Sequence, residues 1–231
     1  TQYKIRRYGA HGTSHMYVNR RTAELMGQDV NTLNMITCHL GNGASITAIK
    51  NGKCVNTSMG LTPLGGIMMG TRSGDIDPTV VFYMMKKLEC TPDEMDTFLN
   101  KRSGMLGVSG ISSDARDIQQ AVDAGNERAK LTVDLYTNRV INVVGGYYMQ
   151  LGHVDAIAFT AGLGENDAQM RERILKDLEE GMGLSIDYEL NKTIHGKECL
   201  ISKPDSKIKV YVVPTNEELV IARDTCRLLG L

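Results

Sequence analysis

Two segments of the chain combine glycine-rich backbone with positions suited to anion binding. HLGNG places Asn42 between two glycines at the end of a run of β-branched residues, and FTAGLGEN contains a second strand-to-glycine turn. Such turns let the backbone approach a ligand closely and expose N–H groups, and a turn that opens a helix adds a favourable dipole. Each segment alone is also compatible with an ordinary turn. Together, and without a Walker-A lysine motif, they favour a nucleotide site outside the P-loop class.

Charged residues in two further segments are suited to phosphate chemistry. GTRSGDIDP places Arg72 in a glycine-rich loop beside Asp75, and the planar guanidinium can hold charge on two oxygens of a transferring phosphoryl group. The alternative is a surface Arg–Asp pair of little energetic value. SSDARDI places Asp114 and Arg116 together, either at a binding site or only at a helix N-terminus.

Histidines and acidic residues supply the remaining candidates. His11 and His15 are spaced four apart, but without the glutamate of H-E-x-x-H or an evident third ligand, so zinc binding is disfavoured. We expect His15 to be structural or capping and His11 to be either a loop residue directed at a ligand or one without a function.

Near the C-terminal end, Thr215 and Glu218 have the spacing of a capping box. This interpretation leaves Glu217 without a structural role, although acidic residues are favoured at a helix start in any case.

Runs rich in β-branched residues, separated by Asn-Gly turns, predict the strands that would hold some of these residues. The runs MITCHLG, ASITAIK and KCVNTS are separated by Asn42-Gly43 and Asn51-Gly52. Asn-Gly between such runs indicates type I′ turns, which need positive φ at both residues. The pattern predicts a three-stranded antiparallel meander.

Helical signals dominate the rest of the chain. Asp77 and Pro78 begin a helix with an apolar face that includes Val80 and Leu88, and Thr91-Pro92 begins another that reaches about residue 102. We expect further helices from residue 113 or 114 and from about 126 to 151, the latter with close packing at Gly145-Gly146. Next come a strand in VDAIAFT, a helix in DAQMRERILKDLEE, a strand in KIKVYVV and a final helix in TNEELVIARDTCRLL. This order predicts a mixed α/β or α+β domain with helices packed on a sheet.

Composition narrows the functional class. The chain has 231 residues, of which 42% are hydrophobic and 23% charged, with a net charge of −1. Nothing in this balance points to nucleic acid or an acidic membrane surface, and no apolar run reaches the ~18 residues of a membrane span. Five scattered cysteines without a C-x-x-C pair indicate free thiols in a reducing cytoplasm.

Several segments in one order resemble the acetokinase family, the acetate kinases and their propionate kinase relatives: RRYGAHGTSH, HLGNGASITAI, TSMGLTPL, MMGTRSGDIDP, FTAGLGEN and PTNEE. The resemblance spans nearly the whole chain. It implies a ribonuclease H-like fold of the actin-like ATPase superfamily. The activity that it implies is reversible phosphoryl transfer between ATP and a short carboxylate, which gives acetyl phosphate and ADP when the carboxylate is acetate.

The resemblance also implies roles for particular residues. Catalysis of phosphoryl transfer depends mainly on alignment and on charge placed around the phosphoryl oxygens. His11 and Arg72 would therefore be catalytic, and Glu217 would help hold Mg²⁺. The implied nucleotide-binding residues lie along the phosphates (His39, Asn42, Gly43), beside the base and ribose (Asp114, Ala115, Arg116) and in the adenosine turn (Gly162, Leu163, Asn166).

Some features depart from the family pattern. Ala10 stands where the family has Phe, Gly65 where it has Glu, and Ala115 where bulkier apolar residues are usual. The family also has an N-terminal half with the other phosphate hairpin, an arginine for the carboxylate and an aspartate for the metal, and this chain begins just after that half. We therefore expect residues 1–231 to be the C-terminal nucleotide-binding domain of a homodimeric acetate kinase without its N-terminal domain. Such a chain alone would bind nucleotide weakly and turn over little. A propionate kinase, an inactive nucleotide-binding fragment and a non-enzymatic assembly module are the alternatives.

Overall fold

The computed structural model describes residues 2–230, which form two compact units. Unit 1 consists of the N-terminal residues up to Gly9, the short segment Asn42–Ala44, and Ser58–Val140. Unit 2 consists of Ala10–Gly41, Ser45–Thr57 and the chain from Ile141 onward. Each unit is described by itself below.

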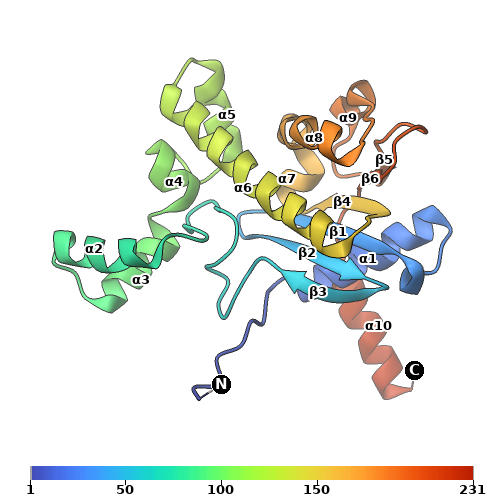
Figure 1. Cartoon of the computed structure of the whole chain (residues 1–231), viewed down its shortest axis with the longest axis horizontal. Helices are drawn as coiled ribbons and strands as arrows, with labels where there is room; N and C mark the ends of the chain where they lie inside the picture. The colour runs from blue at the N-terminus through green and yellow to red at the C-terminus, as the bar shows by residue number, and fades with distance from the viewer. Residues whose placement is uncertain (1, 231) are drawn as a thin grey trace. The chain divides into compact units, whose positions relative to one another are not determined.

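A six-stranded sheet forms the centre of unit 2 (Figure 1). Its strand order is β3-β2-β1-β4-β6-β5. The pairs β1–β4 and β4–β6 are parallel, whereas β2–β3 and β5–β6 are antiparallel. The mixed sheet confirms the predicted mixed α/β class. The strands are β1 (Asn34–Leu40), β2 (Ala44–Lys50), β3 (Lys53–Thr57), β4 (Ala156–Thr160), β5 (Cys199–Leu200) and β6 (Lys209–Val212).

The two Asn-Gly turns of the β1–β2–β3 segment have different backbones. Asn51 and Gly52 have φ angles of 50° and 72°, as a type I′ turn requires. Among the described residues, positive φ at these two turns is confined to that pair. The predicted type I′ conformation of Asn42-Gly43 is therefore wrong, which indicates that contacts beyond the hairpin determine the conformation of this tip.

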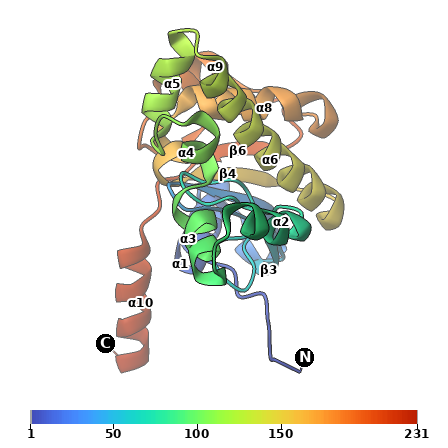
Figure 2. The ribbon, with the colours of Figure 1, turned by 90° about the vertical axis from the view of Figure 1, so that its left-hand side faces the viewer.

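Helix α1 (Gly12–Met26) packs on one face of the sheet. Val18 and Ala23 of this helix are fully or almost fully buried against Met35, Ala158 and Tyr211. Figure 2 shows α8 on the other side of the sheet from α1. Every residue of the central strands β1 and β4 is buried, so both of their faces are covered, as expected for the central strands of an α/β sheet.

The other helices of unit 2 follow β4 and β6. They are α7 (Ala161–Asn166), α8 (Ala168–Met182), α9 (Tyr188–Thr193) and α10 (Glu217–Leu229), with a 3₁₀ turn, η1, at Val30–Thr32. The predicted strand–turn–helix order from residue 154 is confirmed, except that the glycine-rich turn is itself the short helix α7. The predicted capping box at α10 is wrong, because the Asn216 side chain caps the helix and accepts the Leu219 N–H at 3.0 Å.

Unit 1 is mainly helical. It contains α2 (Pro78–Leu88), α3 (Pro92–Lys101), α4 (Gly104–Ser109), α5 (Ala115–Asp123) and the first part of α6 (Glu127–Leu151), which continues into unit 2. Asp77 caps α2, and Thr91 forms a capping box with Glu94 on α3. These predicted helix starts are confirmed because their signals are local.

The prediction of close packing at Gly145-Gly146 is wrong. A Cβ added at either glycine would meet nothing within 4 Å, so these glycines do not mark a close approach. The apolar face of α2 is not covered by other described residues: none of its residues is buried, and Phe82 and Tyr83 are 65% and 58% exposed. The sequence pattern shows a property of the helix but not what lies opposite it.

Two observations concern the thiols and the possible membrane segments. The five cysteines are all free thiols, as predicted. Among residues 2–230, no helix has both the length and the apolar character needed to cross a bilayer.

Candidate nucleotide and phosphoryl-transfer site

Three histidines of unit 2 lie together at the start of α1 and along β1. The ring of His11 stacks on that of His39, with centroids 3.9 Å apart and an angle of 11° between the planes. The Ser45 hydroxyl bonds both His11 Nδ1 and His15 Nε2, each at 2.8 Å. Two of the site residues implied by the resemblance, His11 and His39, are thus in direct contact.

Burial keeps two of these rings neutral. Desolvation, with a smaller effect of neighbouring histidines, lowers the pKa of His15 to about 3 and that of His39 to about 4. His39 Nδ1 is bonded to the Ser14 hydroxyl at 2.8 Å, which leaves Nε2 as the ring nitrogen that can reach a phosphate. His39 can therefore serve a ligand as a neutral hydrogen-bond partner.

His15 has the structural role expected of it. It is 5% exposed, and its Nδ1 bonds the Thr37 hydroxyl at 2.7 Å while Nε2 bonds Ser45. Within residues 2–230, no three His, Cys, Asp or Glu side chains are grouped as metal ligands. His15 acts instead by holding Ser45, which in turn bonds His11.

Unit 1 contains the tip that follows β1, and Asn42 there lies against Gly70. The Gly70 N–H donates to the Asn42 carbonyl at 3.3 Å. A Cβ added at Gly70 would overlap Asn42 Oδ1 and lie 3.1 Å from the Ser113 carbonyl oxygen. The predicted nucleotide residue Asn42 and Ser113, which precedes the predicted Asp114, therefore meet at one glycine.

The loop that carries Arg72 is fastened to the start of α4. Met69 N–H donates to the Arg72 carbonyl at 3.1 Å, and Met105 N–H donates to the Met69 carbonyl at 2.8 Å. Gly104, with φ of 63°, lies too close to Met69 and Arg72 backbone to accept a Cβ. These contacts hold the backbone of Arg72 in place.

The side chain of Arg72 is not paired with Asp75. Arg72 Nη1 donates to the Pro63 carbonyl at 3.3 Å, whereas Asp75 accepts the Gly66 N–H at 2.8 Å. The alternative of an Arg72–Asp75 surface pair is therefore wrong.

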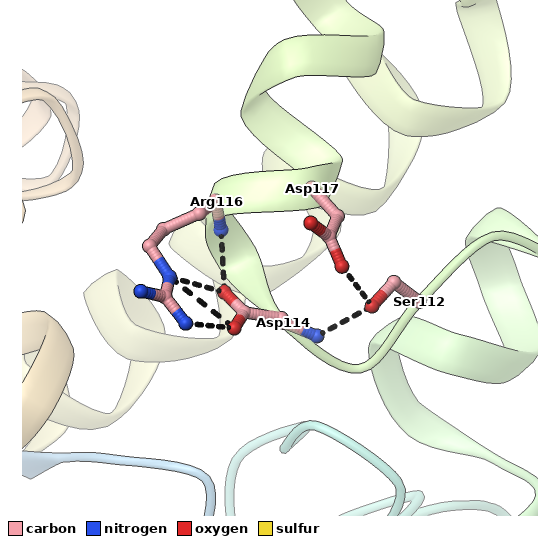
Figure 3. Close-up of polar contacts among 4 residues, drawn as sticks. All are labelled: Ser112, Asp114, Arg116 and Asp117. Atoms are coloured by element: carbon pink, nitrogen blue, oxygen red, sulfur yellow. Dashed lines mark hydrogen bonds and ion pairs between the residues drawn. The ribbon is translucent and has the colours of Figure 1, made fainter.

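Asp114 and Arg116 begin helix α5 (Figure 3). Asp114 accepts the backbone N–H of Arg116 at 2.9 Å and also pairs with its guanidinium. These hydrogen bonds lower the pKa of Asp114 to about 2. Ser112 continues the cluster, because its hydroxyl donates to Asp117 at 2.6 Å and accepts the Asp114 N–H. The pair thus forms the predicted helix N-terminus, while the Arg116 side chain is 86% exposed.

The turn after β4 exposes backbone at Gly162. A Cβ at this position would meet nothing within 4 Å, so its α-carbon faces open space. Asn166 Nδ2 donates to the Gly162 carbonyl at 3.1 Å, and Leu163 lies between them in α7. On the other side of the turn, Gly164 packs against Phe159 and Cys38. The three predicted adenosine residues therefore form one short helix with an open side.

A buried arginine donates a hydrogen bond to the backbone of this turn. Arg171 is fully buried, and its Nη1 donates to the Gly164 carbonyl at 3.0 Å. Its other donors reach Asn191 Oδ1 and the carbonyls of Asn191 and Ile194. Burial lowers the pKa of Arg171 to about 10, so it remains charged at pH 7.

Glu217 is the first residue of α10 and is exposed. Mg²⁺ in phosphate-transferring sites is commonly held by one or two carboxylates together with the substrate phosphates and water. One exposed carboxylate fits that mode and does not require a complete cage of protein ligands.

Three residues with evident roles were missed in the sequence: Ser45, Gly70 and Glu165. Ser45 and Gly70 act through contacts with residues distant in sequence, and nothing in their local pattern marks them. Glu165 lies inside the FTAGLGEN segment, but its carboxylate bonds Thr215, which is 50 residues away.

Comparison with known proteins agrees with these features. The sequence model described as the acetokinase family matches residues 1–223. The acetate kinase of Finegoldia magna is 56% identical over 226 residues, which cover 98% of this chain and 56% of that protein. The acetate kinase of Clostridium botulinum is 57% identical over 224 residues, which cover 97% of this chain and 56% of that protein. The chain thus spans somewhat more than half the length of these relatives.

Solved structures give the same result. The crystal structure of Porphyromonas gingivalis acetate kinase aligns with a TM-score of 0.96 and 49% identity over 99% of this chain and 57% of that chain. A propionate kinase from Francisella tularensis aligns with a TM-score of 0.89 and 42% identity over 96% of this chain and 56% of that chain. The predicted ribonuclease H-like fold of the actin-like ATPase superfamily is consistent with the mixed sheet and these alignments. The chain belongs to the acetokinase family.

Proposed function

We propose that residues 1–231 form the C-terminal nucleotide-binding domain of an acetate kinase. The reaction is reversible transfer of a phosphoryl group between ATP and acetate, which gives acetyl phosphate and ADP. The observation that carries this proposal is the meeting of Asn42 and the Ser113 backbone at Gly70, because it joins a glycine-rich tip to the start of α5. A plain hairpin turn has no need of that contact.

The nucleotide residues divide into three groups with distinct tasks. Backbone and side chain at Asn42 and Gly43, with His39, bind the phosphates as hydrogen-bond donors. Arg116, held by Asp114, lies beside the base and ribose together with Ala115, whose small side chain leaves space there. The open side of α7 accepts the adenosine against Gly162, Leu163 and Asn166, since bare backbone lets a flat base approach closely.

The catalytic residues stabilise charge on the phosphoryl group in transfer. His11 and Arg72 donate hydrogen bonds to its oxygens, and the guanidinium of Arg72 adds a fixed positive charge. The Ser45 hydroxyl fixes the orientation of the His11 ring. Glu217 holds Mg²⁺, which neutralises phosphate charge when bound. None of these residues acts as a nucleophile, because the carboxylate substrate attacks in line.

We propose that the enzyme is a cytoplasmic homodimer that binds ATP or ADP with Mg²⁺ and acetate or acetyl phosphate, without nucleic acid or membrane partners. Acetate is the proposed acceptor rather than propionate, since the acetate kinase of Finegoldia magna matches this chain at 56% identity and the propionate kinase of Francisella tularensis at 42%. Comparison of turnover with the two acids in the full-length enzyme tests this choice.

Direct nucleotide binding tests the proposal in this chain. Titration calorimetry with Mg-ADP should detect binding, and Asn42→Ala or Arg116→Ala should weaken it roughly ten- to hundredfold, the effect of losing one hydrogen bond to a charged group. Asp96→Ala, on the exposed face of α3, is the control and should leave the affinity unchanged. The absence of any thermal shift with saturating Mg-ADP would favour a non-enzymatic module. A full-length protein without acetate-dependent ATP consumption would refute the kinase assignment.

A further inference from the structure

The Glu165 side chain accepts three hydrogen bonds at the turn after β4. Its carboxylate oxygen Oε1 accepts the Ala161 N–H at 2.7 Å and the Thr160 hydroxyl at 3.2 Å. The same oxygen accepts the N–H of Thr215 at 3.1 Å. One carboxylate oxygen therefore joins the end of β4 to the loop before α10.

The first of these contacts holds a strained backbone. Ala161 has a φ of 64°, a left-handed conformation that residues with a Cβ rarely adopt. It is also the first residue of α7, so its conformation sets the direction in which Gly162 and Leu163 leave the strand. A charged acceptor gives a stronger hydrogen bond than a neutral one and can offset this strain.

The contact with Thr215 reaches the segment that ends in Glu217. Thr215 lies two residues before the start of α10, and Asn216 between them caps that helix. The Thr215 hydroxyl is buried without a hydrogen-bond partner among the described residues, so the position of Thr215 depends on its backbone contacts. A glutamate needed only to shape α7 would have no reason to bond a segment 50 residues away.

We infer that Glu165 is a positioning residue that couples the adenosine turn of α7 to the Mg²⁺-holding start of α10. The inference rests on the proposed function for the roles of Gly162 and Glu217, but the mechanical link is a property of the ligand-free chain. If either segment moves, it must break its hydrogen bond to the shared carboxylate oxygen or move that oxygen with it. Adenosine binding at one segment and metal binding at the other should therefore depend on the same side chain.

Hydrogen exchange of the ligand-free chain tests the link without nucleotide. In Glu165→Ala, the amides of both Ala161 and Thr215 should exchange about tenfold faster or more, since both lose a charge-assisted acceptor. Glu165→Gln keeps an acceptor oxygen and should restore most of the protection at both amides. Faster exchange at Ala161 alone would overturn the inference, because Glu165 would then shape only its own turn.

Nucleotide binding tests the functional consequence. Glu165→Ala should weaken ADP binding about tenfold and reduce the gain in affinity that Mg²⁺ gives over EDTA, with Glu165→Gln near the wild type. Glu198→Ala is the matched control, because it removes another carboxylate that ties distant segments, through Arg21 at 2.7 and 2.8 Å. It should change neither the affinity nor the Mg²⁺ gain.

The outcomes separate this inference from the proposed function. A wild-type chain that does not bind ADP refutes the proposed function, whereas the exchange experiment still decides the link. A folded Glu165→Ala with wild-type ADP affinity and Mg²⁺ gain overturns the coupling. If Glu165→Ala does not fold, Glu165→Asp decides, because its shorter side chain draws the carboxylate away from both amides. Exchange should then be faster at both Ala161 and Thr215, and an unchanged rate at Thr215 beside faster exchange at Ala161 overturns the link.

Discussion

Gly70→Ala should weaken nucleotide binding through its neighbour Asn42. Gly70 has no unusual φ, so alanine is compatible with its backbone and the effect arises from contact alone. The added Cβ would overlap Asn42 Oδ1 and lie 3.2 Å from Asn42 Cγ. The Asn42 side chain must rotate away, because real Cβ atoms do not approach so closely.

The magnitude follows from what Asn42 would lose. A hydrogen bond to a charged group contributes about 1.5–3 kcal/mol. Its loss corresponds to a roughly ten- to hundredfold weaker affinity for ADP. The cost to folding should be smaller, about 1 kcal/mol, because most of the overlap is with a side chain that can move. Titration calorimetry and urea unfolding measure the two effects separately.

A double-mutant cycle with Asn42→Ala identifies the route of the effect. If Gly70→Ala acts by displacing Asn42, the double variant should bind ADP about as weakly as either single variant. Gly145→Ala is the matched control, since a Cβ there meets nothing within 4 Å in the middle of α6. It should leave ADP affinity unchanged and stabilise the fold by up to about 1 kcal/mol. Wild-type affinity in Gly70→Ala, or full additivity with Asn42→Ala, would refute the reasoning.

Three further predictions concern the supports of the site. Because burial lowers the pKa of His15 from 6.5 to about 3, the unfolded chain binds more protons between these values, and the stability that His15 contributes above pH 6.5 should fall by about 2 kcal/mol by pH 5. His15→Gln should remove this part of the pH dependence in urea unfolding and leave the similar part that comes from His39, whose pKa is lowered to about 4. Arg171→Met should destabilise the chain by roughly 3 kcal/mol, because four buried acceptor contacts lose their donor, whereas exposed Arg227→Met should change stability by less than about 0.5 kcal/mol. Gly104→Ala should cost at least about 2 kcal/mol, because φ is 63° and the Cβ would overlap Met69 backbone.

Each of these predictions has a contradicting result. An unchanged pH dependence in His15→Gln would mean that His15 does not titrate as its burial requires. A loss below about 1 kcal/mol in Arg171→Met would show that other groups or water satisfy the acceptors. Unfolding of Gly104→Ala at the wild-type urea concentration would show that the start of α4 can move without cost.

Local signals in the sequence predicted local structure. Asp77-Pro78 and Thr91-Pro92 mark helix starts because a cap involves only neighbouring backbone. Asn51-Gly52 forms its expected turn for the same reason. The Asn42 tip differs because Gly70, 28 residues away, bonds its backbone, and no pattern within the hairpin records that contact.

Some residues of the candidate site could be identified from the sequence, and others only from the structure. His11, Arg72 and Gly162 stand in recognisable segments, so their candidacy was visible in the sequence. Ser45 and Glu165 act by bonding groups 30 to 50 residues away, and such roles appear only in three dimensions. Helix α1 was missed because its glycine-, threonine- and histidine-containing start hides the period of its buried residues.

Gly162→Ala tests most directly whether the turn after β4 binds adenosine. A Cβ at Gly162 meets nothing within 4 Å in the chain, so thermal unfolding should be unchanged or slightly higher. A nucleotide lying against the bare backbone would meet the new methyl group, and calorimetry should give an ADP affinity about tenfold weaker or more. Wild-type affinity in a variant of unchanged stability would contradict the account, because adenosine would then lie elsewhere.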